Sequence, residues 1–177
     1  MIKQYYNFTT EEEIVYALQI FKKLEGVYRG NNKGDRYTTL FQDQYDLDFL
    51  TLVSLYTEKI KKILEKDIYI HSSSIVKYNI GDSMCLHSDI QRGCDDDILG
   101  MLVYFDDEYE GGQIFFPNQK IIVKIKPSKG VAITFPSHGD ESMHYVEEVT
   151  SGIRYAMTFC FTTNKAYIKD CYSSLYK

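Results

Sequence analysis

The spacing of apolar residues in the first part of the chain predicts a helix near the N-terminus. Thr9 and Thr10 are each followed three residues later by a glutamate, which is the spacing of a capping box. Apolar residues then recur every three or four positions up to Gly26: Ile14, Leu18, Phe21 and Leu24. We therefore expect a helix that begins at about Thr10 and ends before Gly26.

A polar segment and a second helical pattern follow. Residues 29–36, RGNNKGDR, are rich in glycine and asparagine, which predicts a loop. A second helix is predicted from about Leu47 to Leu64. This helix would carry on roughly one side Leu47, Leu50, Ser54, Ile60 and Leu64.

After Lys66 the pattern changes to short β-branched and aromatic runs, separated by Gly, Pro, Asn and Asp. The runs are IYIHSSSIVKYNI, ILGMLVYF, GGQIFFP, KIIVKIK, GVAITFP and IRYAMTFCFTT. Several strands at such spacing predict a β-sandwich or barrel. The economical architecture is a single domain over residues 1–177, with helices in about 9–66 and a β core in about 67–165.

Composition and charge narrow the function classes. A net charge of -5 argues against nucleic acid as a partner held by bulk electrostatics. The N-terminus lacks the basic-then-apolar pattern of a secretory signal, and no apolar run reaches the ~18 residues of a membrane span. The four cysteines form no CxxC pair, which gives no sign of a zinc knuckle or disulfide framework. These features predict a cytoplasmic protein that does not bind membranes.

A histidine and an aspartate stand two residues apart in the segment CLHSDIQ, residues 85–91. His87 and Asp89 belong to a run with strand character, and residues i and i+2 of a strand point to the same face. Both side chains can therefore reach one point in space. That point is a metal ion, a proton relay or solvent.

Two imidazoles and one carboxylate on one face of an iron ion form the site of non-haem Fe(II) oxygenases. The third ligand is His144 or His138. His138 and Asp140 form a rival HxD, but they follow Pro136 in a glycine-containing loop, where strand geometry is not expected. Arg154 stands in an apolar strand ten residues after His144. If it points inward it needs an anionic partner, either a protein carboxylate or a small dicarboxylate.

The order of these motifs resembles the catalytic core of the Fe(II)/2-oxoglutarate-dependent oxygenases. Within that superfamily it is most similar to the prolyl 4-hydroxylase-like branch and its compact bacterial and viral members, which suggests a bacterial or viral gene. The resemblance covers roughly residues 75–163. It rests on four segments in order: YNIGDSMCLHSD, LVYFDDEYEGGQIFFP, IKPSKGVAITFP and MHYVEEVTSGIRYAMTF.

This resemblance implies a fold and a set of site residues. The fold is a double-stranded β-helix, a mainly β (α+β) jelly-roll or cupin-like core with the N-terminal helices packed on the larger sheet. The implied iron ligands are His87, Asp89 and His144. Arg154 resembles the residue that binds the distal carboxylate of 2-oxoglutarate. Tyr78 and Tyr104 match tyrosines of the same cosubstrate pocket.

Several positions depart from the pattern of the peptidyl-proline hydroxylases, and all of them touch the pocket wall or its approach. Asp97 replaces an arginine, Gly100 and Ile114 replace threonines, and Cys160 replaces a tryptophan. The losses at Gly100 and Cys160 leave a roomier pocket or one refilled by neighbouring Tyr and Phe. Asp97, Cys160 and His138 are therefore candidates for the substrate side.

The resemblance implies a dioxygenase that hydroxylates a C–H bond and converts 2-oxoglutarate to succinate and CO2. Its cofactors are Fe(II), 2-oxoglutarate and O2, with ascorbate as a stimulant. A peptidyl proline is the first expected substrate, and a free amino acid, another small molecule or a nucleobase is the alternative. The non-enzymatic alternative is a metal-binding β-sandwich. A monomer or small homo-oligomer is expected.

Overall fold

The computed structural model describes residues 1–24, 26–30, 34–41, 46–89 and 96–176. The helices are α1 (Glu11–Lys23) and α2 (Leu47–Leu64), with 3-10 helices η1 (Asp140–Ser142), η2 (Lys165–Tyr167) and η3 (Asp170–Tyr176). The strands of the first half are β1 (Lys3–Tyr5), β2 (Val27–Gly30), β3 (Arg36–Phe41), β4 (Tyr69–Tyr78), β5 (Met84–His87) and β6 (Asp97–Tyr104). The later strands are β7 (Glu110–Gly111), β8 (Ile114–Phe116), β9 (Val123–Ile125), β10 (Ala132–Pro136), β11 (His144–Val146), β12 (Val149–Ser151) and β13 (Arg154–Thr162).

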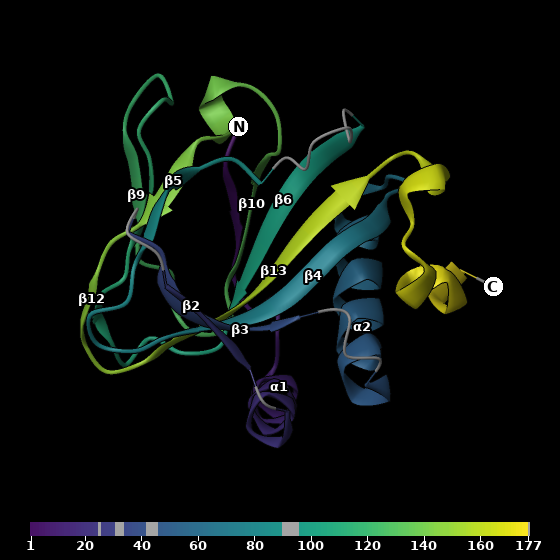
Figure 1. Ribbon diagram of the computed structural model, residues 1–177. Helices are drawn as coiled ribbons and strands as arrows, with labels where there is room; N and C mark the ends of the chain where they lie inside the picture. Colours follow the sequence, from purple (N-terminus) through teal and green to yellow (C-terminus); the bar gives the residue numbers. More distant parts are fainter. Residues whose placement is uncertain (25, 31–33, 42–45, 90–95, 177) are drawn as a thin grey trace.

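The strands form two main antiparallel sheets. The larger has the order β1-β10-β6-β13-β4-β3-β2 and the smaller the order β5-β11-β8-β9, while β12 and β7 form a short ribbon. Figure 1 shows the smaller sheet on the side of the larger sheet away from α2. Apolar side chains of both sheets fill the space between them, among them Val76 and Ile133 from the larger and Phe116 from the smaller. The chain thus forms a β-sandwich with an apolar core between its two sheets.

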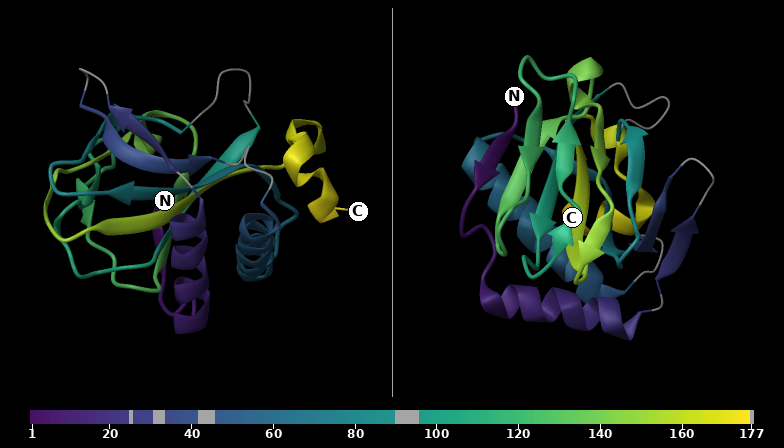
Figure 2. Two further views of the ribbon diagram at one scale, coloured as in Figure 1. Left: turned by 60° about the horizontal axis from the view of Figure 1, so that its bottom comes forward. Right: turned by 90° about the vertical axis from the view of Figure 1, so that its left-hand side faces the viewer.

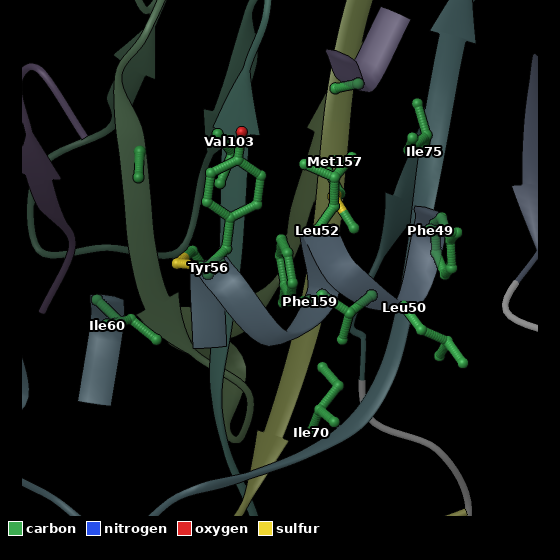
Figure 3. Packing of buried hydrophobic residues seen from close by; sticks show 14 of the residues in the cluster. Phe49, Leu50, Leu52, Tyr56, Ile60, Ile70, Ile75, Val103, Met157 and Phe159 are labelled. Atoms are coloured by element: carbon green, nitrogen blue, oxygen red, sulfur yellow. The ribbon is translucent and has the colours of Figure 1, made fainter. Parts of the chain in front are cut away.

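Both helices cover the outer face of the larger sheet, as the two views of Figure 2 show. The side chains of α2 point at the sheet and meet those of β13 and β4 (Figure 3). At the centre Tyr56 of α2 meets Phe159 of β13 edge-on, with ring centroids 6.1 Å apart. The Tyr56 hydroxyl lies 2.7 Å from the Thr9 hydroxyl, which gives this buried oxygen a hydrogen bond. This core holds the larger sheet from behind and leaves its other face to the interior of the sandwich.

The predicted helices are confirmed, but their packing differs in part. The Thr10 side chain accepts a hydrogen bond from the Glu13 backbone N–H, and the Glu13 carboxylate accepts one from the Thr10 backbone N–H, so the capping box forms. The second helix has the predicted bounds Leu47–Leu64. Of the residues grouped on one side of this helix, Leu50 and Ile60 are buried, whereas Leu47 is 79% exposed. It stands in the first turn, and the helix is buried instead along a side that includes Phe49, Leu52, Val53 and Tyr56.

Strands β1, β2 and β3 were not predicted. The loop prediction for residues 29–36 was partly wrong, because β2 and β3 form an antiparallel hairpin that includes Arg29 and Arg36. Pairing of β3 with β4 stabilises this hairpin, a tertiary contact that local preference does not reveal. Residues 31–33 of the predicted loop lie outside the described residues. Strand β1 pairs with β10 along three residues, too few to give a periodic signal. Among the described residues, no helix is both long and apolar enough to cross a membrane.

Replacing Phe159 by Ala tests whether the helix-side core supports the fold. Phe159 is 1% exposed and contacts both Tyr56 and Phe161, so its removal leaves a cavity that the surrounding strands cannot close. We expect the free energy of unfolding to fall by about 3–5 kcal/mol, measured by chemical denaturation. In the control Tyr6→Ala, where the side chain is 69% exposed, the change should stay within about 0.5 kcal/mol. Equal losses in both variants would contradict this account of the core.

Candidate active site

A cavity of about 420 Å³ opens between the two sheets. Six of the residues singled out in the sequence line it: Tyr78, His87, Asp89, His144, Arg154 and Cys160. They come from β4, β5, β11 and β13 and from the residues just after β5. The fold therefore gathers side chains from distant parts of the chain at one place.

His87, Asp89 and His144 bring their ligand atoms to one point. His144 begins β11 and pairs directly with His87 at the end of β5. Asp89 Oδ1 lies 3.3 Å from His87 Nε2 and 3.7 Å from His144 Nε2. One ligand atom from each residue falls within 4.8 Å of the others. Such a group matches the two-histidine, one-carboxylate set that holds non-haem iron.

Backbone hydrogen bonds orient both imidazoles. His87 Nδ1–H donates to the Cys85 carbonyl at 2.8 Å, and His144 Nδ1–H donates to the Ser142 carbonyl at 2.9 Å. Each bond fixes the tautomer that keeps the Nε2 lone pair free, as in metal-ligating histidines. Both lone pairs then face Asp89. The donor set fits a divalent metal ion on these grounds.

The directions of the pKa shifts of His144 and Asp89 agree with this assignment, whereas for His87 burial acts to lower the pKa but the carboxylate of Asp89 outweighs it and raises the pKa. Burial lowers the pKa of His144, which favours the neutral imidazole. Burial acts to raise the pKa of Asp89, but His144 and His87 beside it outweigh that effect and lower the pKa. A neutral imidazole and an ionised carboxylate are the forms that bind metal.

The rival histidine lies outside this group. His138 and Asp140 follow the end of β10, and Gly139 between them has φ 78°, so the two side chains do not share a strand face. Among the described residues the ligand group consists of His87, Asp89 and His144 alone. His138 and Gly139 lie in the predicted loop, and Asp140 begins η1.

Arg154 is buried and lines the same cavity as the ligand group, and no carboxylate of the described residues is paired with it. It is 1% exposed and pairs across the strands with Tyr78. Its guanidinium carbon lies 4.7 Å from the Tyr78 ring centroid and 5.1 Å from that of Tyr104, and Nη2 donates to the Tyr104 hydroxyl at 3.1 Å. No carboxylate of the described residues forms an ion pair with it. A buried charge of this kind needs an anion, and a carboxylate of 2-oxoglutarate fits the fork of the guanidinium.

The sequence prediction missed two further tyrosines. Tyr37 of β3 lines the cavity and stacks on Tyr78, with ring centroids 5.5 Å apart. Tyr109 is 2% exposed and lies just before β7. Burial raises the pKa of Tyr109 to about 12, while the charge of Arg154 acts in the opposite direction. The only signal for Tyr109 in the sequence is its position before the double glycine of EYEGG, and Tyr37 has none.

The departures from the hydroxylase pattern have different structural outcomes. Phe135 occupies the space at Gly100, where an added Cβ would lie 2.4 Å from the Phe135 ring. The space left by the missing side chain at Gly100 is therefore filled by a neighbouring phenylalanine, which is one of the two outcomes expected for this position. Cys160 lines the cavity opposite Ser72, and Ile114 is buried in the core between the sheets. Asp97 begins β6, and its side chain lies outside the described residues.

Taken together, two antiparallel sheets around a partly buried His-Asp-His group and a buried arginine define a metal-dependent β-sandwich enzyme of the double-stranded β-helix type. The model of the 2OG-Fe(II) oxygenase superfamily matches residues 73–162, and the chain belongs to this superfamily. Its members use Fe(II) and 2-oxoglutarate, and the protein is a dioxygenase of this kind. The superfamily assignment drawn from the sequence is thereby confirmed.

Relatives with known names point in the same direction. Human prolyl 3-hydroxylase 2 is 38% identical over 69 residues, which cover 37% of this chain and 10% of the human enzyme. The viral collagen prolyl hydroxylase of Paramecium Bursaria Chlorella virus-1 has a TM-score of 0.74 at 18% identity, over 92% of this chain and 96% of the viral one. A Trichoplax adhaerens prolyl hydroxylase, solved with a hypoxia inducible factor peptide fragment, has a TM-score of 0.73 at 16% identity, over 94% and 85%. At these identities the two structures establish the shared fold.

Gly100→Ala tests the packing of Phe135 against the ligand group. The Phe135 ring lies 4.9 Å from the His144 ring, so its displacement should move His144. A Gly→Ala change without a clash commonly stabilises a protein by about 0.4–1 kcal/mol. Here we expect a loss of about 1–3 kcal/mol from overpacking, with weaker Zn²⁺ binding. Adding Phe135→Leu to the Gly100→Ala variant should restore part of the stability, measured by denaturation, and part of the Zn²⁺ affinity, measured by metal titration. A stabilised Gly100→Ala variant with unchanged Zn²⁺ affinity would contradict this packing role.

Proposed function

We propose that His87, Asp89 and His144 hold Fe(II), and that Arg154, Tyr78 and Tyr104 hold 2-oxoglutarate. The observation that carries this proposal is the meeting of a three-donor ligand group with a buried, uncompensated arginine in one cavity. A structural metal site has no need of a buried guanidinium beside it. This combination therefore favours the oxygenase over a metal-binding β-sandwich without catalysis.

The residues of the chain have separate tasks in this reaction. When bound, iron and 2-oxoglutarate supply the oxidising chemistry, which uses O2 and yields succinate, CO2 and a hydroxylated product. Arg154 pairs with the distal carboxylate, and the Tyr104 hydroxyl, which accepts from Arg154, keeps its own proton for a further acceptor. The rings of Tyr78 and Tyr104 flank the guanidinium and exclude water from it. Ascorbate would keep the iron reduced between turnovers.

For the substrate we propose a prolyl side chain in a peptide. Support comes from the 38% identity to human prolyl 3-hydroxylase 2 over the matched segment and from the prolyl hydroxylases that share the fold. The cavity wall beyond the ligand group is polar, with the hydroxyls of Ser74 and Thr158 2.8 Å apart. Cys160 lines the same cavity, so we propose it as a substrate-side residue, together with Asp97 and His138. A free amino acid, another small molecule or a nucleobase remains the second candidate.

We further propose that the helices and the β core act as one catalytic domain, as a monomer or small homo-oligomer. The core shared by α1, α2 and the larger sheet supports this, because the sheet would otherwise expose a wide apolar face.

The ligand assignment predicts the effect of three single replacements. His87→Ala, Asp89→Ala and His144→Ala should each abolish the formation of succinate from 2-oxoglutarate, because each removes one of three ligands. Succinate is measured after addition of Fe(II), ascorbate and 2-oxoglutarate, and circular dichroism checks the fold. His138→Ala is the matched control: this assay contains no prime substrate, so a residue on the substrate side is not needed and most of the succinate formation should remain. Loss of activity in His138→Ala with full activity in His144→Ala would refute the assignment.

The substrate proposal predicts mass gains on proline-containing peptides. Wild-type protein and the His87→Ala control are incubated with peptides whose prolines have basic, neutral or acidic neighbours. We expect a gain of about 16 Da on proline with the wild type alone, because one oxygen atom is inserted into a C–H bond. The acidic residue Asp97 in place of an arginine leads us to expect preference for basic neighbours. Oxidation confined to free amino acids or other small molecules would exclude the peptide substrate and leave the oxygenase assignment intact.

A further inference from the structure

Two buried polar atoms beside the cavity lack hydrogen-bond partners among the described residues. One is Nε of Arg154 and the other is the hydroxyl oxygen of Tyr109. Both side chains are almost fully buried, Arg154 at 1% and Tyr109 at 2% exposed. Nε–H is a hydrogen-bond donor and a phenol oxygen is an acceptor, so the two atoms are chemically matched. Leaving either atom without a hydrogen bond in the interior costs free energy. This cost suggests that the two atoms form a hydrogen bond with each other when a ligand is bound.

Two glycines bring these side chains together. A Cβ added at Gly112 would lie 3.1 Å from Cδ of Arg154 and 3.3 Å from Cε2 of Tyr109, so both side chains adjoin the space above this glycine. A Cβ at Gly152 would lie 2.9 Å from Cα of Tyr109 and 2.3 Å from the Glu108 carbonyl oxygen. Gly152 precedes Arg154 by two residues. Because it has no side chain, the backbone at Tyr109 can approach the start of β13. The positive φ of both glycines, 59° and 73°, is a conformation that other residues rarely adopt.

The place of Tyr109 differs from that of the other tyrosines near Arg154. Tyr78 is part of the cavity wall, and Tyr104 accepts a hydrogen bond from Nη2. Like Tyr104, Tyr109 does not line the cavity, and its ring and the Cδ atom of Arg154, which precedes Nε, adjoin the same glycine, Gly112. A bond from Nε–H to the Tyr109 hydroxyl would fix the plane of the guanidinium. Together with the Tyr104 contact it would leave the remaining N–H groups for an anion.

We propose that Tyr109 is a positioning residue for the cosubstrate: its hydroxyl accepts from Arg154 Nε–H and holds the guanidinium in the plane that pairs with the distal carboxylate of 2-oxoglutarate. This inference rests on the proposed function, because it presumes that Arg154 binds that carboxylate. It adds a residue outside the cavity wall to the determinants of cosubstrate affinity. The mutual electrostatic influence of Tyr109 and Arg154 agrees with their proximity.

The experiment compares two ligands that differ only at the distal end. 2-Oxoglutarate and 2-oxopentanoate have the same chain and the same chelating 2-oxo acid, but 2-oxopentanoate lacks the distal carboxylate. Each is titrated calorimetrically into the Zn²⁺-loaded protein, where no turnover occurs. Tyr109→Phe keeps the ring and removes the hydroxyl. We expect its affinity for 2-oxoglutarate to fall on the order of tenfold, with that for 2-oxopentanoate unchanged.

Two controls separate this role from a structural one. Tyr5→Phe also removes a buried hydroxyl without a described partner, but on β1, and should alter neither affinity. In an Arg154→Leu background, where the preference for the diacid should be lost, Tyr109→Phe should have no further effect. Equal losses for both ligands, or unchanged affinities in Tyr109→Phe, would overturn the positioning role alone. A wild type that binds the two ligands equally would overturn the role of Arg154 as well.

Discussion

The antiparallel pairing of β5 with β11 is the constraint on which the candidate site depends. It sets His144 opposite His87, and the alternation of the chain after β5 brings Asp89 to the same side. Bringing two imidazoles and a carboxylate this close together costs hydration free energy, because each group loses water. A bound cation would offset that cost. The backbone carbonyls of Cys85 and Ser142 orient both rings, so the ligand geometry is built into the strands themselves.

A second pairing, between β13 and β4, governs the other end of the cavity. It sets Arg154 opposite Tyr78 and buries the guanidinium among aromatic rings. A permanent positive charge in such surroundings is stabilised far better with an anion present than without one. Arg154 and the His-Asp-His group line the same cavity, which supports the proposal that a carboxylate ligand pairs with this arginine.

The larger sheet carries these groups because its two faces have different tasks. The outer face packs on α1 and α2 through residues such as Met157 and Phe159, which alternate along β13 with the inward-facing Arg154, Ala156 and Thr158. The period of two in a strand makes this division possible, since a shift by one residue would exchange the faces. The rigid helix-side core thus fixes the positions of the catalytic side. Phe135, which fills the space over Gly100 and contacts His144, extends this support into the sandwich.

The sequence by itself determined the features that depend on local pattern and motif order. The capping box at Thr10, the bounds of α2 and the spacing from His87 and Asp89 to His144 and Arg154 were all readable, because each is encoded in residues near one another or in a fixed order. What depends on contacts between distant strands was decided by the tertiary structure. The hairpin of β2 and β3 exists through pairing with β4, and the register of β3 brings Tyr37 to the cavity wall. Tyr109 lies outside that wall, near Arg154, because Gly112 and Gly152 have no side chains there. Such contacts leave no periodic trace in the chain, since long-range packing selects one partner among many residues of the same type.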